Sequence, residues 1–110
     1  MNGKSFKQGD VFLAKVQYTD TFEVKKRPIL ILYEQYDNIV VAGVTSNTRM
    51  DGVHLTKEDG ALKDSVIKLN YIFTISTHLL ERHLFSLPKR KREEVYDYLV
   101  GMLEGFVSSS

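Results

Sequence analysis

Two apolar segments separated by a short turn constrain this chain more than any other feature. The first runs from Ile29 to Tyr33, the second runs from Ile39 to Val44, and Asp37-Asn38 lies between them. The first segment is apolar at nearly every position and rich in β-branched residues, which is typical of a strand covered on both faces. Asp and Asn are common turn residues. The sequence therefore predicts a hairpin of two buried strands.

Polar residues stand at one end of this hairpin. Arg27-Pro28 opens the first strand, where a proline is tolerated, and the second strand runs out into Thr45, Ser46 and Asn47. Antiparallel pairing would bring the Arg27 guanidinium near the Thr45 hydroxyl. A guanidinium binds phosphate oxygens in two places, and a hydroxyl and an amide add hydrogen bonds, so this end of the sheet suits a phosphate. The plainer alternatives are a surface ion pair of Arg27 and an ordinary polar turn after the second strand.

The rest of the chain divides into short strands and one helix. We expect strands at 11–18, 53–55, 65–69 and 71–75, the last two bent around Asn70, with an exposed loop at 19–26 and a turn or brief helical bend at 57–63. Pro88 suits the first turn of a helix at 87–106. One apolar stripe follows at helical spacing, formed by Val95, Leu99, Met102, Leu103 and Phe106. Residues 107–110 are expected to form a frayed tail.

These elements predict a single domain over residues 1–110 that is mainly β (α+β): a small, twisted antiparallel barrel with a C-terminal helix packed against it. The chain has no cysteine, and His54, His78 and His83 have no ligand-like spacing, so neither a metal site nor a cofactor is expected. No apolar run is long enough for a membrane span, and the N-terminus lacks the apolar core of a signal peptide. A cytoplasmic location is therefore expected.

The net charge is only +1, so binding of nucleic acid would depend on local patches. Cations bunch at 25–27 and at 89–92. The second run lies at the start of the expected helix, where the helix dipole disfavours positive charge. The run either has no partner-binding role or marks a surface for an acidic partner. Solvated surface is the commoner fate of such runs.

Five motifs occur in an order and at spacings that resemble the MazF/PemK/Kid toxins, the endoribonuclease halves of bacterial toxin–antitoxin pairs. They are Gly9-Asp10, Arg27-Pro28 leading into Ile-Leu-Ile-Leu, Val44–Asn47, Asp64–Ile67 and Thr74–Ser76. The resemblance covers nearly the whole chain and implies an SH3-like antiparallel β-barrel that forms a homodimer. It also implies metal-independent cleavage of single-stranded RNA through 2′-OH attack, leaving cyclic phosphate and 5′-OH ends. A short, acidic antitoxin would inhibit the enzyme.

The resemblance places catalysis on Arg27 and Thr45. Some members carry an arginine and an aspartate where this chain has Lys68 and Asn70, and Asn70 cannot accept a proton as a general base. Glu23, four residues before Arg27, is our candidate base, with Asp20 and Asp51 as further options. The residues expected to bind RNA are Lys25, Lys26, Ser46, Asn47, Lys68, Asn70 and Thr21, the last standing where the family usually has Ser or His.

A non-catalytic member of the same fold is the alternative. It would be a gyrase poison similar to CcdB or a module that binds RNA or protein, and it stays open because of Asn70 and because Phe73 replaces an arginine often found in the family. The triple-serine end gives no support to the gyrase poison, which relies on residues near its C-terminus. Four tyrosines are either base-stacking residues or part of the core edge or a dimer interface: Tyr18, Tyr33, Tyr36 and Tyr71.

Overall fold

The computed structural model describes residues 6–17 and 24–108. These residues form six strands, two 3₁₀ turns and one helix. In order they are β1 (Asp10–Gln17), β2 (Val24–Gln35), β3 (Asn38–Thr45), β4 (Val53–Leu55), η1 (Lys57–Asp59), β5 (Ser65–Ser76), η2 (Thr77–Leu79), β6 (Leu80–Ser86) and α1 (Lys89–Ser108).

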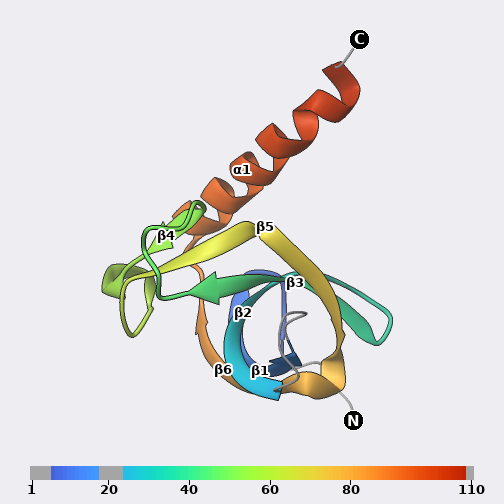
Figure 1. Cartoon of the computed structure of the whole chain (residues 1–110), viewed down its shortest axis with the longest axis vertical. Coiled ribbons are helices and arrows are strands. Elements are labelled where there is room, and N and C mark those ends of the chain that lie inside the picture. The colour runs from blue at the N-terminus through green and yellow to red at the C-terminus, as the bar shows by residue number, and fades with distance from the viewer. Residues whose placement is uncertain (1–5, 18–23, 109–110) are drawn as a thin grey trace.

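All six strands belong to one curled antiparallel sheet, with the order β4-β5-β3-β2-β1-β6 (Figure 1). The pairing of β2 with β3 runs from Gln35↔Asn38 to Ile29↔Gly43, which confirms the predicted hairpin. The sheet and the single terminal helix confirm the predicted mainly β fold. Within the described residues no ladder joins β4 to β6, so the sheet forms a half-barrel.

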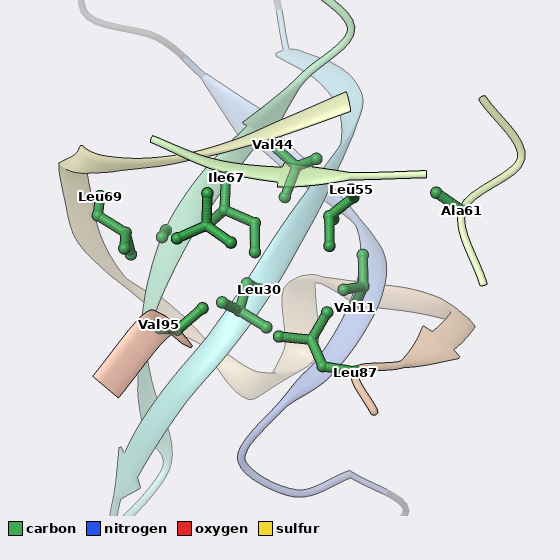
Figure 2. Close-up of a cluster of buried hydrophobic side chains, with 11 residues drawn as sticks. Val11, Leu30, Val44, Leu55, Ala61, Ile67, Leu69, Leu87 and Val95 are labelled. Carbon is green, nitrogen blue, oxygen red and sulfur yellow. The ribbon is translucent and has the colours of Figure 1, made fainter. Parts of the chain in front are cut away.

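The hydrophobic core lies on both faces of the sheet. Ile29, Leu30 and Ile31 are all fully buried, as expected for a strand covered on both sides. Leu30 belongs to the cluster in Figure 2, which fills the space between the curled sheet, including β4, and the start of α1. Ile29 and Ile31 belong to a second cluster on the opposite face, with Ile39 and Val41 of β3.

Strand β5 contains a bulge. Its pairing with β3 passes from Ala42↔Ile72 directly to Gly43↔Lys68, so residues 69–71 are extra on β5. The expected bend around Asn70 is therefore present, but within one strand of 12 residues rather than between two. The extra residues reverse the alternation, because Ile67 packs in the first cluster and Ile75 in the second.

Two stretches of sheet differ from the sequence prediction. Residues 24–26, expected in the loop at 19–26, extend β2 and pair with residues 15–17 of β1. Strand β6 was not predicted at all. It pairs with β1 at the edge of the sheet through two register shifts, so its half-buried residues show no period of two. Residues 18–23, which cover the rest of the expected loop and the last residue of the first predicted strand, lie outside the described part.

The helix packs against the sheet only through its first half. The prediction that its whole apolar stripe would pack against the barrel is therefore wrong. Val95 is buried and Leu99 is half-buried, whereas Met102, Leu103 and Phe106 are exposed. A helix of 20 residues is about 30 Å long, and its C-terminal half projects beyond the sheet (Figure 1). Residues 107–108, expected in the frayed tail, are helical. Neither this helix nor the short turns in the described ranges has the length and hydropathy to span a bilayer.

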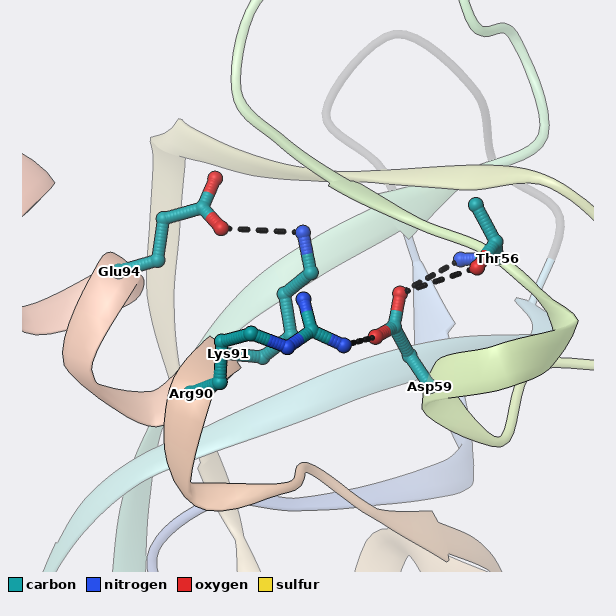
Figure 3. Close-up of polar contacts among 5 residues, drawn as sticks. All are labelled: Thr56, Asp59, Arg90, Lys91 and Glu94. Atoms are coloured by element: carbon teal, nitrogen blue, oxygen red, sulfur yellow. Dashed lines mark hydrogen bonds and ion pairs between the residues drawn. The ribbon is translucent and has the colours of Figure 1, made fainter.

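The buried carboxylate of Asp59 fixes the start of α1 (Figure 3). Its Oδ2 accepts hydrogen bonds from the backbone N–H of Thr56 at 2.9 Å and from the Thr56 hydroxyl at 3.3 Å. Its Oδ1 accepts one from Arg90 Nη2 at 2.7 Å. Lys91 pairs with Glu94 at 3.0 Å. Much of the positive charge at the helix start is thus paired within the chain. This favours the hypothesis that the cationic run at 89–92 has no partner-binding role.

Candidate anion-binding site

A pocket of about 590 Å³ opens where β2 begins and β3 ends. Antiparallel pairing brings these two ends together, and the start of β5 and the loop before it close the other side. The residues that line it are Lys26, Arg27, Pro28, Gly43, Val44, Thr45, Ser46, Lys63, Ser65, Lys68 and Tyr71. The hairpin thus brings Arg27 and Thr45 to one pocket.

The β2–β3 register explains why Arg27 and Thr45 line the same pocket. Ile29 pairs with Gly43, and the same register continued by two residues sets Arg27 opposite Thr45. Arg27 is half-buried, with its Nε atom fully covered. The Thr45 hydroxyl accepts a hydrogen bond from the backbone N–H of Asn47 at 3.1 Å. A hydroxyl that accepts one bond still has its own proton to donate, so Thr45 can donate to an anion in the pocket.

The pocket lining is strongly cationic. It includes Lys26, Arg27, Lys63 and Lys68, and none of the described residues that line it is Asp, Glu or His. Such a surface attracts an anion and provides several donors to it. The described residues of the lining therefore form a site suited to phosphate, and they include no carboxylate or imidazole that could act as a general base.

One of these cations has a partner outside the pocket. The Lys26 ammonium lies 3.1 Å from Glu81 of β6, which also lies 3.5 Å from Lys15. The hydrogen bond from Lys26 lowers the pKa of Glu81, and Lys15 lowers it further, against the opposing effect of burial. Lys26 thus helps to join β2 to the edge strand β6, in addition to lining the pocket.

Five of the residues predicted to form the site line this pocket: Lys26, Arg27, Thr45, Ser46 and Lys68. Lys25 and Asn70 are exposed and do not belong to its lining. Asn47 does not line it either. Its Oδ1 accepts a hydrogen bond from the Arg49 backbone N–H at 3.1 Å. This contact agrees with the alternative prediction of an ordinary polar turn after the second strand. Asp51 is exposed and also outside the lining.

Glu23, Thr21 and Asp20 lie outside the described residues, so the candidate base is not placed.

The prediction of the site omitted Lys63, Ser65 and Gly43, and left Tyr71 among four tyrosines without choosing between them. Ser65 donates a hydrogen bond from its hydroxyl to the Lys63 carbonyl at 2.9 Å, which fixes the turn that leads into β5. Tyr71 reaches the pocket from the bulge of β5. A Cβ atom added to Gly43 would lie 2.9 Å from the Tyr71 ring, so the glycine makes room for this ring. A Gly inside a predicted strand was the available signal of such a close approach.

A serine, a histidine and an aspartate also meet on the edge of the sheet, where they link β1 to β6. Ser86 donates to Asp10 Oδ1 at 2.6 Å, and His83 Nε2 lies 3.1 Å from Ser86 Oγ and 3.6 Å from the same carboxylate oxygen. In a catalytic triad the imidazole stands between serine and aspartate and uses both ring nitrogens. Here one ring nitrogen faces both partners. The cluster therefore lacks the arrangement of a triad.

No group of three His, Asp or Glu side chains that would hold a metal ion occurs within residues 6–17 and 24–108.

Several solved structures are similar to this chain over most of its length. The Mycobacterium tuberculosis toxin MazF-mt6 has 21% identity and a TM-score of 0.69, with 86% of this chain and 96% of that chain covered. A mycobacterial endoribonuclease in complex with its cognate antitoxin has 16% identity and a TM-score of 0.72, with 93% and 96% covered. A MazE–MazF structure from Deinococcus radiodurans has 19% identity and a TM-score of 0.72, with 93% and 98% covered. At these identities the likeness establishes the fold.

Among curated proteins none matches this sequence. A family model does match, over residues 7–103, and it describes a PemK-like, MazF-like toxin of type II toxin–antitoxin systems. The match covers the half-barrel, the pocket and most of the terminal helix. The sequence motifs, the fold and the family model agree, and the chain belongs to the PemK/MazF toxin family.

Proposed function

We propose that this protein is a toxin endoribonuclease that cleaves single-stranded RNA without a metal ion and is inhibited by a cognate antitoxin. The observation that carries the proposal is the pocket in which Arg27 and Thr45 lie among further cations, with no acid in its described lining. Membership of a toxin family whose activity is RNA cleavage supports the reaction type.

The proposed reaction uses the 2′-OH of the RNA as the nucleophile. A base removes the 2′ proton, the 2′ oxygen attacks phosphorus, and the bond to the 5′ oxygen breaks to leave a cyclic phosphate and a 5′-OH end. Arg27 binds the non-bridging oxygens and stabilises the charge of the phosphorane, and the Thr45 hydroxyl donates a further hydrogen bond. Because a guanidinium is not deprotonated in proteins, Arg27 acts as an electrostatic group and water protonates the leaving oxygen.

Glu23 is the proposed general base. It stands four residues before Arg27 in the sequence, and the described lining of the pocket supplies no carboxylate. Acid–base assistance contributes about 10²–10⁴-fold to such a step. Lys25, Asn47 and Asn70 are proposed as outer contacts of the RNA, because they lie outside the lining of the pocket. Thr21 is proposed to contact the RNA because it stands where the family usually has Ser or His.

The proposed assembly is a homodimer. The C-terminal half of α1 exposes Met102, Leu103 and Phe106, and the side chain of Phe106 is 85% exposed. An apolar groove of about 560 Å³ lies between this helix and strands β2, β3 and β5, and Leu103 is part of its lining. An exposed apolar surface of this kind is commonly an interface. A second copy of the chain is the proposed occupant.

The other proposed partner is a short acidic antitoxin. One of the similar structures is an endoribonuclease in complex with its cognate antitoxin, and another is a MazE–MazF structure. The cationic pocket offers an acidic segment the same attraction that it offers RNA. The proposed location is the cytoplasm, where single-stranded mRNA is available.

The test of the proposed function is incubation of purified protein with single-stranded RNA in EDTA, beside an Arg27→Ala variant. Discrete cuts that leave cyclic phosphate and 5′-OH ends are expected from the wild-type protein and not from the variant. Circular dichroism and sedimentation serve as controls that Arg27→Ala keeps the fold and the oligomeric state. Equal cleavage by a folded Arg27→Ala protein would contradict the catalytic role of Arg27. Intact RNA after incubation with the wild type would favour the non-catalytic alternative.

A further inference from the structure

The wall of the pocket opposite Arg27 is formed by three residues that the catalytic proposal does not use fully: Lys63, Lys68 and Tyr71. Lys63 comes from the turn before β5, Lys68 from β5 before its bulge, and Tyr71 from the end of the bulge. They join two ammonium groups and an aromatic ring in one place. A nucleotide carries the complementary groups: a phosphate that binds the ammonium groups and a base that stacks on the ring.

Tyr71 is held firmly in this wall. Its ring approaches Gly43 of β3 so closely that a Cβ atom there would lie 2.9 Å from Cδ2. On its own strand it packs on Phe73, with ring centroids 5.1 Å apart at 43°. Phe73 in turn packs against the second core cluster. The ring is therefore fixed by the fold, and stacking on it requires little further ordering of the protein.

The cations lie within reach of the same ligand. Lys68 Nζ lies over the Tyr71 ring, 5.4 Å from its centroid, a distance at which the ammonium is attracted to the ring. A base that stacks on this face takes the place of the ammonium, and the flexible lysine stem lets the charge move to the phosphate. Lys63 is exposed, and its carbonyl is held by the Ser65 hydroxyl at 2.9 Å. A nucleotide whose base stacked on Tyr71 would carry its phosphate close to Lys68. The negative charge of this phosphate would attract both lysines.

We propose that Lys63, Lys68 and Tyr71 form a nucleotide subsite beside the scissile phosphate, in which Tyr71 stacks on a base of the RNA and the two lysines bind the phosphate of that nucleotide. The inference rests on the proposed function of the same pocket. It adds a residue that reads the RNA through base stacking and a second phosphate contact besides Arg27.

The stacking is tested with 2-aminopurine, a base whose fluorescence falls when it stacks. The probe is a single-stranded RNA that the wild-type protein cuts, made uncleavable by one 2′-deoxy sugar at the cut, with 2-aminopurine placed at one neighbouring position at a time. We expect quenching at one position with the wild type and Tyr71→Phe, and loss of this quenching with Tyr71→Leu. The dissociation constant of Tyr71→Leu should rise about 5- to 150-fold, the range for removal of one stacked base.

Tyr98→Leu is the matched control, because Tyr98 lies on α1 and outside the pocket lining. If Tyr71→Leu does not fold, Gly43→Ala takes its place, since the added methyl group displaces the Tyr71 ring from its seat. Quenching and affinity that stay at wild-type values in a folded Tyr71→Leu or Gly43→Ala protein would overturn the stacking role.

The phosphate contacts are tested by the salt dependence of binding. Each phosphate contact with a single strand contributes about 0.7 to the slope of log Kd against log salt concentration. We expect Lys63→Met and Lys68→Met each to lower this slope by about that amount, and Lys57→Met, which changes an exposed lysine outside the pocket, to leave it unchanged. Unchanged slopes in both pocket variants would overturn the second phosphate contact.

These readouts separate the subsite from the nuclease. Cleavage by the wild type with normal binding by Tyr71→Leu overturns the subsite alone. If the wild type cuts no RNA but binds a mixed-sequence single strand, with the quenching lost in Tyr71→Leu, the subsite stands and the nuclease assignment fails. Absence of both cleavage and RNA binding overturns both.

Discussion

The guanidinium of Arg90 lies 2.7 Å from the carboxylate of Asp59, an ion pair that joins the first turn of α1 to η1. The carboxylate side chain is 2% exposed and the arginine side chain is 62% exposed. The pair therefore connects a buried acceptor to a donor at the surface. Because Val95 and Leu99 one and two turns later pack on the core, this pair sets where the helix leaves the sheet.

Removal of the Arg90 side chain should weaken the fold. Arg90→Met leaves Asp59 Oδ1 without its donor in a buried position, at a cost of about 1–2 kcal/mol in the free energy of unfolding after allowance for the exposed arginine. Urea denaturation measures this difference. Lys89→Met is the control, since Lys89 and Glu93 are both exposed and 4.0 Å apart, and its effect should stay below about 0.5 kcal/mol. Equal effects of the two variants would contradict the role given to Arg90.

The stability should fall in acid partly through Asp59. Burial raises the pKa of this carboxyl, but hydrogen bonds from Thr56 and Arg90 and the nearby charge of Lys91 lower it by more, to below its ordinary value of 3.8. The unfolded chain therefore takes up this proton at a higher pH than the folded protein. The stabilisation from the charged form is complete above about pH 4 and is lost as the pH falls through the folded pKa.

Urea midpoints measured between pH 7 and pH 3 check this dependence. The difference between the wild type and Asp59→Asn should be largest at neutral pH and should shrink below about pH 4, as the wild-type carboxyl becomes protonated. Two curves that stay parallel over this range would show that Asp59 does not titrate with folding.

The Thr45 hydroxyl should be needed for cleavage and hardly needed for stability. Thr45→Val keeps the shape but removes the donor proposed for the phosphorane, so kcat/KM should fall about 10²-fold. It also removes the acceptor for the Asn47 N–H, which is exposed to water, so the free energy of unfolding should change by less than about 1 kcal/mol. Thr45→Ser keeps the hydroxyl and should cleave at close to the wild-type rate. Cleavage by Thr45→Val as fast as by Thr45→Ser would remove Thr45 from the reaction.

Charge on the exposed face of α1 should dissociate the proposed dimer. Leu103→Glu and Phe106→Glu place carboxylates on an apolar surface that a second copy would bury, so both should sediment as monomers at concentrations where the wild type is a dimer. Glu104→Gln, a change on the same turn, should leave the dimer intact. A wild-type protein that sediments as a monomer, or a dimer that tolerates both glutamates, would exclude this face as the dimer interface.

Local patterns in the chain were sufficient for much of the fold and for part of the pocket. The β2–β3 hairpin was predictable because Ile29–Ile31 and Ile39–Val44 are apolar over a strand's length and a turn separates them. Arg27 and Thr45 then followed, since antiparallel pairing alone brings the two ends of a hairpin together. The terminal helix was predictable from its spacing of apolar residues, although the spacing did not show that the sheet covers only its first half.

The remaining features depend on contacts between residues far apart in the chain. Strand β6 has no clear alternation of its own, because it is an edge strand that follows β1 through two register shifts. The bulge at residues 69–71 exists only relative to β3, and it turns Tyr71 onto Gly43 and into the pocket. Side-chain periodicity within one strand reports which residues share a face, but it carries no information on the register of a distant partner. The hairpin that carries Arg27 and Thr45 was therefore predictable from the amino-acid sequence. The wall formed by Lys63, Lys68 and Tyr71, in contrast, depends on the pairing of β5 with β3.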